Sequence, residues 1–230
     1  MAGALRPFCD FCVTLKMNNE DYIDFHTHHP SLNGERVIQD GVDTQGRHPW
    51  HLTSIPPHNG GGREESIAIG ESGLDRLCDT LYELQLSVFH EEVILSEELQ
   101  KPLFLHCVRA IDDMLRIRKE LNAHQPWIWH GYRGNAQQLG QLLKLSEQAL
   151  LPSGRAGRGT FYFSFGPHFN TEALLACPFD RLLLETDDDT TTAIADLYAE
   201  VARLRNIPLE SLIKQMHTNF HTLFGNATDF

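Results

Sequence analysis

The chain has 230 residues, of which 41% are hydrophobic and 22% charged, and its formal net charge is −12 with histidine counted as neutral. This length accommodates one α/β barrel or two small domains. The negative charge disfavours a broad nucleic-acid-binding surface, which needs a basic face, but it is compatible with an enzyme that acts on the end of a nucleic-acid strand. No apolar run reaches the roughly 18 residues of a membrane-spanning helix, so we expect no membrane association. Nothing in the sequence indicates an obligate protein partner.

The first strand of the sequence is preceded by residues 1–17, which we interpret as a loosely attached extension of a single domain at 18–230. Cys9 and Cys12 in this extension form a CxxC, but no second CxxC or CxxH follows to complete a closed zinc site. The cysteines of the whole chain are odd in number and irregularly spaced. This usage favours a reducing, cytoplasmic compartment.

Short apolar strands alternate with helices along most of the chain, after a first strand that begins near Tyr22. Apolar spacing predicts further strands at 66–75, 101–107, 126–134, 160–166 and 181–187, helices at 80–100, 109–122, 135–148 and 170–176, and two closing helices. Such alternation indicates βαβ units and a parallel sheet, and about eight units close a barrel. The segment between His29 and residue 46 is too short for a full strand–helix–strand unit. We therefore predict a TIM-type (β/α) barrel that is shortened in its first units, with a doubly wound sheet as the alternative.

Most of these strands end in a side chain that can bind a metal ion. His26 and His28 share one face of the first strand with Asp24, because side chains alternate along a strand. Later strands add Glu71, His106, His130 and Asp187. In a parallel barrel all these strand ends lie on one face, where barrel enzymes carry their catalytic groups. We therefore expect these histidines and carboxylates to form one ring.

This mixed nitrogen and oxygen set suits Zn²⁺, Mn²⁺ or Fe²⁺, and Mg²⁺ less well. One catalytic metal that keeps open positions does not need so many ligands, whereas two metals that share a bridging carboxylate do. The alternative for any single histidine is a hydrogen-bonded core residue. That alternative does not account for the whole ring, because buried carboxylates without basic partners are costly.

The residues around the predicted ligands also resemble a known family. The matching segments are "DFHTHH", "GRHPWH", "GESGLD", "LHCVRA", "HGYRG", "LLLETD" and "NFHTLFG", which run in the family's order from about residue 22 to 225. On these motifs the chain resembles the TatD-like metal-dependent hydrolases (DNases), a branch of the amidohydrolase-type barrels. The resemblance implies that two divalent ions (Zn, Mn or Mg) bind as cofactors.

The resemblance also assigns roles to the ring. His26, His28, Glu71 and Asp187 would hold one ion, and Glu71 with His106 and His130 would hold the other. Glu71 would bridge the ions, and Asp187 would take a proton from the metal-activated water. The implied activity is that of a deoxyribonuclease that cleaves phosphodiester bonds, acting on a nucleic-acid end or a small phosphodiester.

Three departures from the family pattern leave the ligands unchanged, and the first and the last of them alter the rim of the site. The region before "GRHPWH" is short, the commoner "HCR" reads "HCVR", and "DDTTT" replaces the usual proline after "ETD". These departures therefore bear on substrate choice rather than on the chemistry. The alternatives are amidohydrolase-type hydrolysis of a small amide, lactone or ester, and a non-enzymatic metal-binding interaction protein with a vestigial site. The complete ligand set disfavours the second.

Further residues are candidates for substrate contact. The set comprises His48, His51, Arg109 and Arg133. The two histidines lie on a loop near the mouth of the barrel, and each arginine follows a predicted ligand histidine by three residues, so all of them can reach a substrate phosphate. Loop stabilisation is the alternative for the histidines, and surface ion pairs are the alternative for the arginines. The glycine-rich segment 152–159 lacks the Lys-Ser/Thr end of a P-loop, and we interpret it as a flexible loop on the far face of the barrel. His217 and His221 resemble half of HExxH, but residue 218 is threonine, so we expect no metal there.

Overall fold

The computed structural model describes residues 18, 21–54, 63–148 and 160–225. Its strands and helices follow the predicted alternation. The strands are β1 (Ile23–Thr27), β2 (Arg36–Gln39), β3 (Thr44–Gln45), β4 (Ala68–Asp75), β5 (Leu103–Val108), β6 (Trp127–Trp129), β7 (Phe161–Phe165) and β8 (Leu182–Leu184). The helices are α1 (Tyr82–Leu99), α2 (Ile111–Glu120), α3 (Ala136–Gln148), α4 (Thr171–Ala176), α5 (Ile194–Arg205) and α6 (Leu209–Phe224), with short 3₁₀ turns η2 (Pro49–His51) and η3 (Phe179–Arg181).

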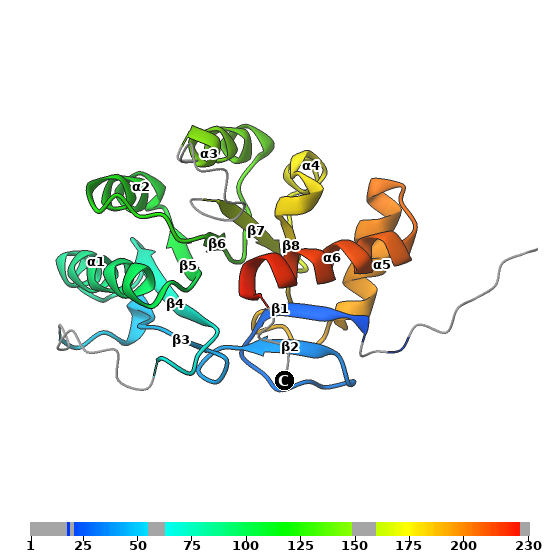
Figure 1. Ribbon diagram of the computed structural model, residues 1–230, viewed down its shortest axis with the longest axis horizontal. Helices are drawn as coiled ribbons and strands as arrows, with labels where there is room; N and C mark the ends of the chain where they lie inside the picture. The colour runs from blue at the N-terminus through cyan, green and yellow to red at the C-terminus, as the bar shows by residue number, and fades with distance from the viewer. Residues whose placement is uncertain (1–17, 19–20, 55–62, 149–159, 226–230) are drawn as a thin grey trace, which may run out of the picture.

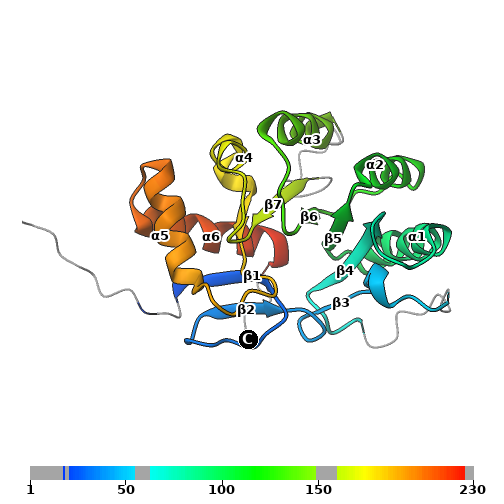
Figure 2. The ribbon, with the colours of Figure 1, turned by 180° about the vertical axis from the view of Figure 1, so that it is seen from behind.

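The strands form a ring through parallel pairing. β3 to β8 pair in sequence order as one sheet, and β1 pairs with β2 as a second. Single bridges join the two sheets at both ends, Thr27 to Asp187 and Asp40 to Thr44. The predicted TIM-type barrel is therefore confirmed. In both ribbon views α1 to α4 lie outside the sheet and β1 lies beside β2 (Figures 1 and 2).

The first units of the barrel are shortened, as the sequence predicts. No helix separates β1 from β2 or β2 from β3. Gly41, with φ of +77°, donates its N–H to Thr44 between β2 and β3. A positive φ is readily adopted by glycine, so the chain turns here within a few residues. β2 and β3 were not predicted, because runs of four and two residues are too short to show a period.

The core lies inside the ring and between the ring and its helices. Every residue of β6, β7 and β8 is buried, as expected for parallel strands covered on both faces. The last helix reaches two parts of the ring: Phe220 contacts Phe25 of β1 at 6.3 Å between ring centroids, and Phe224 stacks on Phe104 of β5 at 6.4 Å. No helix in the described ranges is long and apolar enough to cross a membrane. The proposed domain boundary at residue 17 and the Cys9–Cys12 pair lie outside the described residues and stay predictions.

Candidate metal centre

The carboxylate of Glu71 lies between two groups of histidines inside the barrel. Its Oε2 is 3.3 Å from Nε2 of His26 and 3.5 Å from Nε2 of His28. Its Oε1 is 2.6 Å from Nδ1 of His106 and 2.7 Å from Nε2 of His130. Each oxygen of one buried carboxylate therefore faces a different group of imidazoles.

Asp187 joins the group on the Oε2 side. Its Oδ1 lies 3.3 Å from Nε2 of His28 and 3.9 Å from Nε2 of His26. The closure of the barrel positions it, because the Asp187 N–H donates to the His26 carbonyl and the Asp187 carbonyl accepts from the His28 N–H. Segments that are far apart in the sequence are thus held together by backbone hydrogen bonds.

An irregularity in β4 places Glu71. The pairing of β4 with β5 shifts register between Ile69 and Ser72, and Gly70 between them has a φ of +129°. A Cβ atom at Gly70 would lie 2.7 Å from Phe104, so a side chain does not fit at this position. The Glu71 N–H then donates to Oδ1 of Asp40 at 2.9 Å.

The expectation that every ligand ends its strand is wrong in detail. β4 continues past Glu71 to Asp75, and β5 continues past His106 to Val108. His130 directly follows β6, and Asp187 lies beyond β8. The six side chains still meet, because the barrel brings these different strand depths to one place.

The carboxylates and imidazoles of the site shift one another's pKa values. Burial raises the pKa of Glu71, but His130 and His106 outweigh it and hold that pKa well below its usual range. Burial also raises the pKa of Asp187, but the hydrogen bond with His28 acts against burial, and the pKa of Asp187 is lowered overall. Hydrogen bonding to Asp187 and then Glu71 raises the pKa of His28 to about 10. Both carboxylates are therefore charged at neutral pH, and they attract cations.

Buried polar atoms without partners indicate that a cation fits here. His26 is completely buried, and within the described part of the chain neither of its ring nitrogens has a hydrogen bond. Unpartnered buried nitrogens are costly. A divalent ion bound by imidazole and carboxylate would use the lone pair of the His26 nitrogen that faces Glu71, so the donor set fits Zn²⁺ or Mn²⁺.

Two acidic residues that were not among the predicted ligands contact His106 and His130 at the ring nitrogen that faces away from Glu71. Oδ2 of Asp75 lies 3.2 Å from Nε2 of His106 and accepts a hydrogen bond from Nε1 of Trp50 at 2.7 Å. Oε1 of Glu185 lies 3.5 Å from Nδ1 of His130. Both acids belong to the motifs "GESGLD" and "LLLETD". Their spacing from the ligands was visible in the sequence, but the imidazoles that they contact were not.

The predicted substrate residues fall into different places. His48 joins the ring, with Nε2 3.1 Å from Oε1 of Glu71 and 3.1 Å from Nδ1 of His106. His51 is exposed, and its ring centroid lies 5.6 Å from that of His48. Arg133 is exposed and lines a small pocket with Asp187 and His168. His168 follows β7, the one predicted strand that was not expected to carry a ligand.

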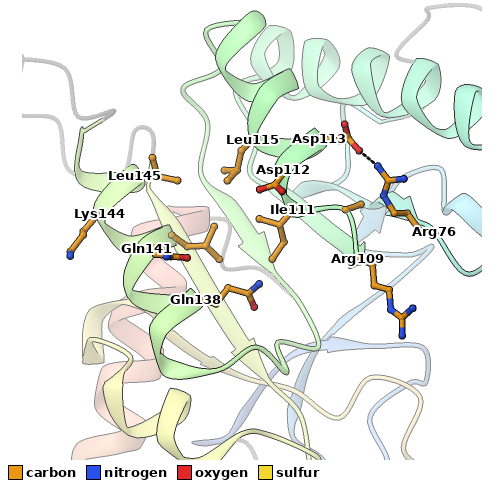
Figure 3. A pocket seen from close by; sticks show the side chains of 12 residues that line it. Arg76, Arg109, Ile111, Asp112, Asp113, Leu115, Gln138, Gln141, Lys144 and Leu145 are labelled. Carbon is orange, nitrogen blue, oxygen red and sulfur yellow. Dashed lines mark hydrogen bonds and ion pairs between the residues drawn. The ribbon is translucent and has the colours of Figure 1, made fainter.

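Arg109 lies beside a groove of about 650 Å³ between α2 and α3. Figure 3 shows Arg76 and Arg109 on one side of this groove and Gln138 and Lys144 of α3 on the other. None of the described residues that line it is a metal-ligand candidate.

His217 lies outside the ring, and its Nε2 is 2.8 Å from the Asp21 carbonyl. The segment 152–159 lies outside the described residues.

Comparison with known proteins agrees with this arrangement. The model of the TatD related DNase family matches residues 40–225. The uncharacterized metal-dependent hydrolase YabD of Bacillus subtilis is 31% identical over 133 residues, which cover 54% of this chain and 47% of that protein. The human 3′-5′ RNA nuclease TATDN2 is 31% identical over 126 residues, which cover 54% of this chain and 16% of that protein. The chain thus covers less than two-thirds of either relative.

Longer matches exist. The 3′-5′ ssDNA/RNA exonuclease TatD of Klebsiella pneumoniae is 28% identical over 221 residues, which cover 76% of this chain and 77% of that protein. Among solved structures, the TatD homolog YjjV of Escherichia coli aligns with a TM-score of 0.71 at 19% identity, over 90% of this chain and 98% of that one. This likeness shows the barrel fold. With the family match over residues 40–225, the chain belongs to the TatD related DNases, a family of metal-dependent hydrolases.

Proposed function

We propose that the protein hydrolyses phosphodiester bonds at the end of a nucleic-acid strand, with two divalent ions as cofactors. The observation that carries the proposal is the position of the Glu71 carboxylate, whose two oxygens face two different groups of ligands. His26, His28 and Asp187 would hold one ion with Oε2. His106 and His130 would hold the other with Oε1. Zn²⁺, Mn²⁺ and Mg²⁺ are the candidates.

Two such ions, when bound, supply a water activated for attack on phosphorus and stabilise the charge that develops on the phosphoryl oxygens. Asp187 is suited to accept the proton of the attacking water. Its pKa is lowered, so it is a carboxylate at neutral pH, and its side chain is 26% exposed. The Glu71 side chain is only 2% exposed, which suits a shared ligand that does not exchange protons with solvent.

Arg109 and Arg133 are suited to hold substrate phosphates outside the ring. Both are exposed, and within the described ranges neither makes an ion pair. Guanidinium groups bind phosphate through two parallel hydrogen bonds. The names of the human and Klebsiella relatives, an RNA nuclease and an ssDNA/RNA exonuclease, support a nucleic-acid end as the substrate. We also propose a reducing, cytoplasmic site of action, because the cysteines are irregularly spaced and the three described ones are free.

A substrate panel tests the proposal. The metal-depleted protein is supplied with Mg²⁺, Mn²⁺ or Zn²⁺ and incubated with end-labelled single-stranded DNA, RNA and duplex DNA. Small esters, lactones and amides form a second panel. We expect shortening of the oligonucleotides that EDTA abolishes. Turnover of the second panel alone would contradict the proposal in favour of amidohydrolase-type chemistry, and no turnover with any metal would contradict an enzymatic role.

The matched control is His217→Ala. This histidine lies away from the ring, and its Nε2 lies 2.8 Å from the Asp21 carbonyl. Its variant should degrade oligonucleotides at the wild-type rate. The His26→Ala variant, in contrast, should lose the activity. Equal activity of the two variants would indicate a contaminating nuclease.

A further inference from the structure

Trp50 is a large apolar side chain exposed next to the metal centre. It lies on the 3₁₀ turn η2 between His48 and His51, and 58% of its surface is exposed. The other tryptophans, Trp127 and Trp129, are buried in β6 at 0% and 2% exposure. An exposed indole at the rim of a catalytic site needs an explanation, because tryptophan normally contributes a large buried area.

The indole is held in one orientation. Its Nε1 donates to Oδ2 of Asp75 at 2.7 Å, and the Trp50 backbone N–H donates to Nδ1 of His48 at 3.2 Å. The imidazoles of His48 and His106 meet the indole at 87° and 77°, with centroids 4.9 and 5.7 Å away. Neither imidazole therefore lies flat on the indole. The ring is fixed at its edge and leaves aromatic surface free for a ligand.

Trp50 lies one side chain away from the shared carboxylate of Glu71. One imidazole, that of His106, separates the indole from Oε1 of Glu71, the oxygen that both His106 and His130 approach. A nucleobase is separated from its phosphate by one sugar. A phosphate at the ring would thus bring a neighbouring base close to the indole.

We propose that Trp50 is a stacking platform for the nucleobase next to the scissile phosphate. The inference rests on the proposed phosphodiesterase function and specifies its substrate. Bases stack on aromatic side chains with little sequence preference, because every base has a π-face. Bases inside a duplex are already stacked and paired, so an indole at the rim reaches only an unpaired end.

Two substitutions at this position separate stacking from the hydrogen bond. Trp50→Phe and Trp50→Leu both remove the N–H that Asp75 accepts, but only Phe keeps an aromatic face. Their comparison therefore isolates the stack. The substrate pair is a short oligothymidylate and the same oligomer with an abasic terminal nucleotide, one version for each end.

We expect the Leu variant to have a KM about 5- to 150-fold above that of the Phe variant on the intact oligomer, with similar kcat. On the oligomer that lacks the stacked base, the two variants should have the same KM. Equal KM values on the intact oligomer, or a difference that persists on both abasic oligomers, would overturn the proposal. Circular dichroism of both variants confirms that they are folded.

Intrinsic fluorescence gives a readout that does not depend on turnover. Because Trp50 is the exposed member of the three tryptophans, a phosphorothioate oligomer that resists cleavage should quench the wild-type emission saturably. The Trp50→Phe variant should show no quenching, and the abasic oligomer should quench less. Saturable binding without quenching refutes the stack. A wild-type protein that cleaves no phosphodiester refutes the proposed function instead, so the two failures are distinguishable.

Discussion

Asp75 lies behind His106, with Oδ2 3.2 Å from Nε2 of the imidazole, while Nδ1 on the other side lies 2.6 Å from Glu71. A neutral imidazole carries a proton on only one nitrogen. A carboxylate at Nε2 favours the tautomer with the proton there. Nδ1 is then free to bind a metal ion, and the ring is held in the orientation that directs it to the centre.

The Asp75→Asn variant should bind the ion at His106 and His130 about 10- to 100-fold more weakly than the wild type does. A carboxamide has one oxygen, and it cannot accept from Trp50, His106 and the Leu77 N–H as the carboxylate does. Calorimetric titration of the metal-depleted protein with Mn²⁺ measures the affinity. Asp79→Asn, an exposed change in the same loop, is the control. Unchanged affinity in Asp75→Asn would show that this aspartate does not orient the histidine.

The Glu71→Gln variant should first lose the ion at His106 and His130. A bridging carboxylate offsets the repulsion between two divalent cations, and a neutral amide does not. His106 and His130 would be left without the charged oxygen that lies 2.6 and 2.7 Å from them. Elemental analysis should find about two ions per wild-type chain and one or fewer in the variant. Full loading of Glu71→Gln would contradict the bridging role.

The Asp187→Asn variant should keep its ions and lose its rate. The side-chain oxygen of asparagine can still coordinate, and His26, His28 and Glu71 remain. The amide does not accept a proton at neutral pH, so kcat should fall about 10²- to 10⁴-fold, the usual contribution of a general base. Metal content and kcat are measured on the same preparation. A normal kcat at full loading would assign proton transfer to another group.

The convergence of the six predicted ligands could be predicted from the sequence, because strand periodicity and the parallel barrel together indicate which side chains share one end of the sheet, whereas the place of His48 beside them could not. His26 and His28 share a face, and the ends of parallel strands share an edge. The depth of Glu71 in β4 was not predictable. It depends on a register shift between Ile69 and Ser72, where Gly70 lies too close to Phe104 to carry a side chain.

The groups that support the histidines were also beyond a sequence-based prediction. Asp75 and Glu185 lie in recognisable motifs, but their contacts with His106 and His130 depend on how neighbouring strands are paired. The exposed position of Trp50 was not predictable either. Nothing local distinguishes an exposed tryptophan from a core one, and two of the three tryptophans in this chain are core residues.

A glycine pair tests the close contact of β4 with β5. A Cβ atom at Gly73 would lie 1.9 Å from the carbonyl oxygen of its pairing partner His106, so Gly73→Ala must displace the backbone that carries this ligand. We expect a loss of about 3 kcal/mol in the free energy of unfolding. At Gly140 in α3 nothing lies within 4 Å, and Gly140→Ala should stabilise the protein by about 0.5–1 kcal/mol. Urea denaturation compares them, and a tolerated Gly73→Ala would refute the contact.

A buried ion-pair cluster anchors the loop that carries His48 and Trp50. Oε1 of Glu92 in α1 lies 3.2 Å from Nε of Arg47 and 2.6 Å from a terminal nitrogen of Arg63, and the Glu92 side chain is fully buried. Glu92→Gln would leave two poorly exposed guanidinium groups without their shared countercharge. Breaking a buried pair on one side costs about 3–5 kcal/mol.

We therefore expect Glu92→Gln to reduce the free energy of unfolding by that amount, measured by urea denaturation. The exposed Glu83→Gln on the same helix should change it by about 0.5 kcal/mol or less. Because Arg47 directly precedes His48, the Glu92 variant should also lose the fluorescence quenching that we expect from Trp50, even where it remains folded. Unaltered stability would show that the arginines find other partners. Unaltered quenching in a destabilised variant would show that the loop is held by the Asp75 hydrogen bond alone.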